Sequence, residues 1–109
     1  MKFYKKGDVL TYEGNEAKEI FILESGKLGI FKKDKLITEI DTKGSIVGEL
    51  AMILQNTRSA SVIALEDSAV YEIKVPLEVL AEKYPDVTVD ILKSLAKRLV
   101  KTTNQLALK

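Results

Sequence analysis

The sequence predicts a mainly β domain that ends in helices. Along the first two thirds of the chain, short runs alternate apolar and polar residues, and turn residues close each run. Short strands about ten residues apart are typical of an antiparallel sandwich or barrel. The last third changes to apolar residues at helical spacing. We therefore expect a single domain over residues 1–109, with strands up to about residue 75 and helices over about 76–108.

Seven short strands account for the alternating part. Gly14 and Gly26 provide turn chemistry after the first two runs, and the polar pair Lys33-Asp34 separates two runs that form a hairpin. Gly44 marks a further turn before a very short strand. The expected strands span residues 8–12, 19–24, 27–32, 35–40, 45–47, 60–64 and 68–75.

Three segments read as helices. The apolar run from Gly48 to Leu54 contains good helix formers and predicts one or two helical turns between strands. Pro76 suits the first turn of a helix that continues through Lys83, and Pro85 opens a second one. The last helix has an apolar stripe that we expect to lie on the barrel. Its residues are Val87, Ile91, Leu92, Leu95, Leu99 and Leu106.

The composition excludes several classes of protein. The chain has no cysteine, so it has neither disulfides nor thiolate metal sites, and it has no histidine, the commonest general base and transition-metal ligand. A formal net charge of +1 gives no strong field for nucleic acid or membrane. The basic start is not followed by an apolar signal-peptide stretch. We expect a soluble, cytoplasmic, non-enzymatic domain without a metal.

The stretch from Gly48 to Ala64, GELAMILQNTRSASVIA, contains the residues that indicate chemistry. Unpaired backbone N–H groups at the start of a short helix attract anions, and Arg58 lies ten positions after Gly48, where a returning loop can aim it at the same anion. Arginine matches phosphate oxygens with two parallel hydrogen bonds. Glu49 fits beside a phosphate if it accepts a hydrogen bond from a hydroxyl, such as a ribose 2′-OH. A 3′,5′-cyclic nucleotide has both a phosphate and a free 2′-OH. On the spacing of these residues alone, it is one possible ligand.

The same stretch resembles the phosphate-binding cassette of the cyclic-nucleotide-binding domains. This family includes the bacterial catabolite activator protein, the regulatory subunits of cyclic-AMP-dependent kinase and the cyclic-nucleotide-gated channels. Segment 3–10 is similar to the family's opening strand, 14–26 to its first turn and hairpin, and 95–99 to its last helix. The resemblance implies an antiparallel β-roll (a jelly-roll-like, double-stranded β-helix) with a short helix in the cassette and two C-terminal helices.

The resemblance also implies a role for each cassette residue. Glu49 would accept the ribose 2′-OH, Arg58 would hold the phosphate, and Gly48 would allow the close approach of the ligand. Backbone or hydroxyl contacts would come from Leu50, Ala51, Ser59 and Ala60. The family usually has an aromatic residue where this chain has Val47, and often a proline where it has Thr57. These two departures remove no ligand contact.

The implied function is a sensor of cyclic nucleotide, cAMP more than cGMP, that transmits ligand occupancy through its C-terminal helix. The nucleotide is a ligand and no cofactor is expected. Partners would be a second copy in a homodimer or an effector domain, not nucleic acid or membrane. Two alternatives stay open. Glu49 and Arg58 could form a structural ion pair, and the domain could be a degenerate β-roll that serves only for protein interaction or dimerisation.

Overall fold

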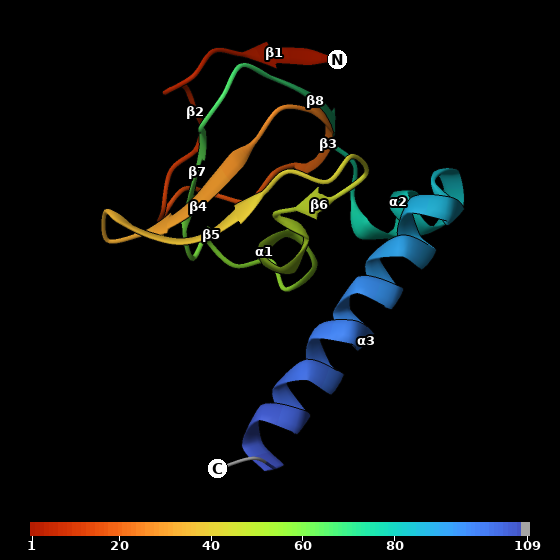
Figure 1. Cartoon of the computed structure of the whole chain (residues 1–109). Coiled ribbons are helices and arrows are strands. Elements are labelled where there is room, and N and C mark those ends of the chain that lie inside the picture. Colours follow the sequence, from red (N-terminus) through yellow and green to blue (C-terminus); the bar gives the residue numbers. More distant parts are fainter. Residues whose placement is uncertain (108–109) are drawn as a thin grey trace. The chain divides into compact units, whose positions relative to one another are not determined.

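The computed structural model describes residues 1–107, which comprise eight strands and three helices (Figure 1). The chain divides into two compact units, one over residues 1–75 and the other from residue 76 onward. All strands and the short helix α1 (Glu49–Ile53) belong to the first unit, and helices α2 (Leu77–Lys83) and α3 (Pro85–Ala107) belong to the second.

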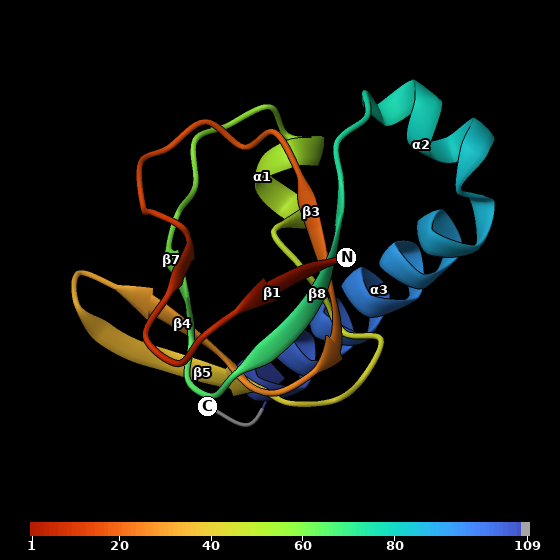
Figure 2. The same ribbon diagram turned by 90° about the horizontal axis from the view of Figure 1, so that it is seen from above.

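The first unit is a β-roll of two four-stranded antiparallel sheets. One sheet has the strand order β1-β8-β3-β6 and the other β2-β7-β4-β5, and the two lie on opposite sides of the unit (Figure 2). The predicted fold class is therefore confirmed. The strands are β1 (Lys2–Tyr4), β2 (Val9–Thr11), β3 (Ile20–Ser25), β4 (Leu28–Lys32), β5 (Lys35–Ile40), β6 (Ile46–Val47), β7 (Ser61–Ala64) and β8 (Ser68–Ile73).

The core of the β-roll lies between the two sheets, because alternate residues of each strand point inward. Phe21 and Leu23 of β3 are fully buried, and Leu28 of β4 approaches them from the other sheet. Burying a side chain of this size contributes about 1.5–3 kcal/mol. The remaining buried members of this cluster are Val47, Val62, Ala64 and Val70.

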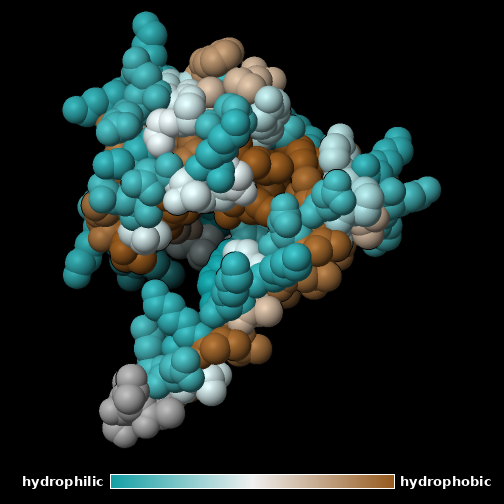
Figure 3. Space-filling view, turned by 45° about the vertical axis from the view of Figure 1, so that its right-hand side comes forward, coloured by the Kyte–Doolittle hydropathy of each residue, from teal (hydrophilic) through white to brown (hydrophobic). Residues whose placement is uncertain are grey.

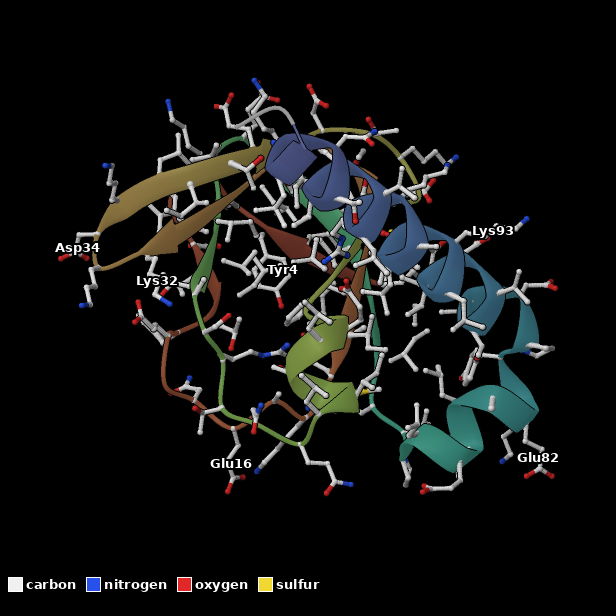
Figure 4. All side chains as sticks on the ribbon, turned by 90° about the horizontal axis from the view of Figure 1, so that it is seen from below. Tyr4, Glu16, Lys32, Asp34, Glu82 and Lys93 are labelled. Atoms are coloured by element: carbon white, nitrogen blue, oxygen red, sulfur yellow. The ribbon has the colours of Figure 1, made fainter. Side chains whose placement is uncertain are left out.

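Strand β1 extends the sheet at its edge and was not expected from the alternation. It pairs with β8, where Phe3 lies opposite Ala69, yet the Phe3 side chain is largely exposed. Tyr4 is half-buried, and its hydroxyl donates a hydrogen bond to Glu72 Oε1 at 3.2 Å (Figure 4 labels Tyr4). Burial, together with the Glu72 carboxylate, raises the pKa of Tyr4 to about 12. An edge strand with an exposed aromatic residue has no amphipathic pattern to detect.

The second unit consists of two helices joined at Tyr84. The hydroxyl of Thr88 donates to the Tyr84 carbonyl at 2.9 Å, and the Tyr84 amide donates to the carbonyl of Leu80 at 2.8 Å. These bonds satisfy backbone groups where α2 ends and α3 begins. Among residues 1–107, no helix combines the length and apolar character that crossing a bilayer requires.

The stripe expected along α3 is not uniformly buried, because Leu92 and Leu99 are 62% and 68% exposed. Ile91 is buried and Leu95 is half-buried. Adjacent helical residues point about 100° apart, so a face that buries Ile91 leaves its neighbour Leu92 outside. Leu99 and Leu106 follow Leu92 at seven-residue steps and share its exposed face, and Figure 3 shows apolar atoms in brown along the helix.

The β4–β5 hairpin offers a test of the fold. Lys33 and Asp34 connect the strands with φ values of 49° and 65°, the left-handed conformation of a two-residue type I′ turn, and Asp34 lies at its tip (Figure 4). Residues with a Cβ are strained there, and Asn-Gly is favoured. We expect Lys33→Asn combined with Asp34→Gly to raise the free energy of unfolding by about 1 kcal/mol. Thermal denaturation should then show a Tm several degrees higher.

The matched control is Asp34→Ala, which keeps a Cβ at positive φ and should not raise the Tm. A lower Tm for the Asn-Gly variant would contradict the assigned turn.

Candidate functional site

The candidate site begins at the junction of β6 and α1. Gly48 has φ 87° and ψ 8°, a left-handed conformation that favours glycine, and Glu49 follows as the first residue of α1. A Cβ on Gly48 would also collide with Nη1 of Arg58. Glycine is therefore required at this position for its backbone and for the space that it leaves to the arginine.

The loop after α1 returns the chain to the β-roll and fixes the backbone of Arg58. The Arg58 amide donates to the Asn15 carbonyl at 2.8 Å, and the Gly14 amide donates to the Arg58 carbonyl at 2.8 Å. A bridge between Glu16 and Thr57 extends this pairing by one step. The turn at residues 14–15 was expected only to end a strand. It thus also anchors Arg58, the candidate phosphate-binding residue.

The Arg58 side chain is buried in the β-roll, with the residue 4% exposed. Its Nη1 donates to the Gly48 carbonyl at 2.7 Å, and its Nη2 donates to the Glu19 carbonyl at 2.5 Å. The same Nη2 lies 3.5 Å from Oε1 of Glu19, and the guanidinium carbon lies 5.4 Å from the centre of the Phe21 ring. These contacts hold the guanidinium on several sides.

One nitrogen of this guanidinium remains available. Within residues 1–107, Nε of Arg58 is a buried donor without a hydrogen-bond partner. A buried donor that stays unpaired costs about 1–3 kcal/mol. Burial also lowers the pKa of Arg58 below its usual range, while the carboxylates of Glu19 and Glu49 oppose that shift. The site therefore contains a cation that an additional acceptor would stabilise.

The structure brings Glu49 close to Arg58. Glu49 is 2% exposed, and its charge acts on that of Arg58. A carboxylate is rarely buried this deeply unless charged or polar groups surround it. The Glu49 and Arg58 pair expected from the sequence thus lies in one buried cluster. Helix α1 supplies the carboxylate and the following loop supplies the guanidinium.

The remaining cassette residues surround this cluster with different exposures. Leu50 and Ser59 are exposed, whereas Ala51 and Ala60 are half-buried, as is Gly48. All of them lie on one continuous segment that wraps α1, between β6 and β7. These exposures do not distinguish which of the residues would face a ligand, so their ligand roles stay predictions.

Glu19 is the site residue that the sequence did not reveal as one. It was expected only as the start of a strand, and it precedes β3 in the structure. Its partner Arg58 is 39 positions away in the sequence. The contact depends on the pairing of distant segments, and a lone glutamate before a strand carries no sign of it.

Known proteins resemble this chain in sequence and in fold. The family model of the cyclic nucleotide-binding domain matches residues 1–77. A cGMP-dependent protein kinase from Toxoplasma gondii is 41% identical over 61 residues, which are 56% of this chain and 6% of the kinase. The chain thus spans less than a tenth of the length of that relative.

Two solved structures extend the likeness to nearly the whole chain. The catabolite activator protein of Thermus thermophilus superposes with a TM-score of 0.82 at 24% identity, covering 98% of this chain and 53% of that one. The cAMP-bound PfPKA-R (141–441) superposes with a TM-score of 0.73 at 28% identity, covering 99% and 37%. Since the family model covers all eight strands and the cassette between β6 and β7, the chain belongs to the cyclic nucleotide-binding domain family.

Proposed function

We propose that this domain is a sensor that captures a 3′,5′-cyclic nucleotide in its cassette. The observation that supports this most is the buried Arg58 guanidinium, which keeps Nε unpaired among the described residues and lies beside the buried Glu49. A cyclic phosphate monoanion supplies the acceptor that Nε lacks, and the ribose 2′-OH supplies a donor for Glu49. The module regulates and does not catalyse.

The other cassette residues complete the proposed site. The proposed phosphate position is beside the Arg58 guanidinium, which occupies the space that Gly48 leaves, and beside the exposed Ser59. Leu50, Ala51 and Ala60 contribute backbone N–H groups. A degenerate β-roll without ligand is the alternative, and the unpaired Nε argues against it because a purely structural arginine would have all its buried donors satisfied.

We propose a modest preference for cAMP over cGMP. The relatives named above include a cGMP-dependent kinase and a cAMP-bound structure, so the family accommodates both bases. Ser59 directly follows Arg58, and its hydroxyl can contact either the phosphate or a guanine amino group. We place this sensor in the cytoplasm, where it responds to the cell's own cyclic nucleotide.

We further propose that α3 transmits ligand occupancy to a second copy of the chain or to an effector domain. The helix runs without interruption from Pro85 to Ala107 and keeps Leu92, Leu99 and Leu106 exposed. Apolar residues at seven-residue steps on one face suit a partner helix. A conformational change of α3 on ligand binding would thereby alter its contact with the partner helix.

The two charged contacts are separable by mutation. Arg58→Ala removes charge-assisted hydrogen bonds and should weaken cAMP binding by at least about 2–4 kcal/mol in calorimetry. Glu49→Ala should cost less and should hardly affect binding of 2′-deoxy-cAMP, which has no hydroxyl for it. Lys35→Ala, which removes an exposed cation from β5, is the control and should leave the affinity unchanged.

If the wild-type protein binds 2′-deoxy-cAMP as tightly as cAMP, the role of Glu49 is wrong. Binding by Arg58→Ala at wild-type affinity would refute the phosphate site itself. Arg58→Lys keeps the buried charge and serves where the alanine variant does not fold.

Transmission through α3 is testable by amide hydrogen exchange. Saturating cAMP should change the exchange rates of amides in α3 as well as in the cassette, because the proposed signal passes from one unit to the other. With Arg58→Ala at the same cAMP concentration, both changes should disappear. Unaltered exchange in α3 of the saturated wild-type protein would contradict the proposal while leaving the binding site intact.

A further inference from the structure

We propose that Glu19 sets the affinity of this site by competing with the phosphate of the ligand for Arg58. This proposal rests on the proposed function, because it identifies the Glu19 carboxylate as the anion that a bound cyclic nucleotide has to displace from Arg58. It makes Glu19 an affinity-determining residue in addition to the cassette.

The competition follows from where the carboxylate lies. Oε1 of Glu19 is 3.5 Å from Nη2 of Arg58, and the two side chains are only 15% and 3% exposed. Charges this far from water are weakly screened, so the carboxylate neutralises much of the attraction that the guanidinium offers to another anion. In the free protein Glu19 thus occupies the role that a phosphate would take.

The charges around Arg58 weaken the binding of an anionic ligand. Two carboxylates, of Glu19 and Glu49, act on the single cation of Arg58. A phosphate monoanion that approaches Arg58 therefore meets two carboxylates that already act on this guanidinium. Glu49 has a donor to gain from the ribose, whereas Glu19 gains nothing from the nucleotide and only loses its partner.

The carboxylate is not needed to position the arginine. Nη1 and Nη2 donate to the backbone carbonyls of Gly48 and Glu19 at 2.7 and 2.5 Å, both shorter than the contact with the Glu19 carboxylate. Both acceptors are backbone groups and remain in Glu19→Gln. The amide variant therefore removes the competing charge while keeping the guanidinium in place.

What Glu19 provides instead is stability of the free protein. Burial lowers the pKa of Arg58, and the Glu19 carboxylate opposes this shift more than any other group. Removing the charge leaves a buried cation less well compensated, which destabilises the ligand-free state. Affinity and stability should therefore move in opposite directions, a result that a merely structural role does not produce.

The test compares Glu19→Gln with Glu16→Gln in calorimetric titrations with cAMP and in thermal denaturation without ligand. Glu16 lies on the same loop with its side chain 78% exposed and points outward (Figure 4), so its variant makes the same charge change outside the site. Glu19→Gln should bind cAMP about tenfold more tightly than wild type, near 1.4 kcal/mol. It should also have a lower Tm, and Glu16→Gln should stay within about twofold of wild type.

Combining Glu19→Gln with Arg58→Ala identifies the route. Competition for Arg58 predicts that the gain in affinity disappears in the alanine background, as in a double-mutant cycle. Glu19→Asp, which withdraws the carboxylate but conserves the charge, should give a smaller gain than Glu19→Gln.

Equal or weaker binding by Glu19→Gln than by wild type overturns the proposal, and so does a gain that persists without Arg58. Failure of the proposed function looks different, because then wild type, Glu19→Gln and Glu16→Gln all fail to bind cAMP at millimolar concentration.

Discussion

The buried guanidinium of Arg58 is the interaction on which the arrangement of the cassette depends. Two backbone carbonyls, those of Gly48 and Glu19, accept hydrogen bonds from its terminal nitrogens. Phe21, a fully buried core residue, lies against the same group. One arginine thus connects the turn before α1, the loop before β3 and the hydrophobic core. A buried cation of this kind is stable only where acceptors surround it on most sides.

The rest of the first unit can be understood as the support for this cation. Pairing of Arg58 with the turn at residues 14–15 fixes its backbone, and the two sheets fix the strands from which those turns emerge. Gly48 leaves the space in which the guanidinium lies. Binding residues often lie on loops that a rigid scaffold positions, because the sequence of a loop can vary without loss of the core. The second unit presents exposed apolar residues along α3.

Much of this fold could be predicted from the sequence, and what was missed has identifiable causes. Alternation and glycine turns predicted the strands from β2 to β8, most of which have buried residues, whereas β5 is largely exposed and was identified by its alternation and the polar pair before it. The alternation did not predict β1, since Phe3 is exposed and its pairing with Ala69 is nonlocal, and only the family resemblance of segment 3–10 indicated a strand there. The sequence did not predict that Ile91 is buried while Leu92 is exposed, because the two residues are adjacent and both apolar. The cassette was found by resemblance, whereas Glu19 required the three-dimensional pairing.

We propose that Nε of Arg58 donates to the phosphate of the ligand, and nuclear magnetic resonance of the arginine Nε–H groups observes this donor itself. The chain has two arginines, Arg58 and Arg98, so the spectrum of a ¹⁵N-labelled sample contains two such signals, and Arg98→Lys assigns them. We predict that cAMP shifts the Arg58 signal and slows its exchange with water. Saturated binding of cAMP with an unchanged Arg58 Nε–H signal would contradict the account.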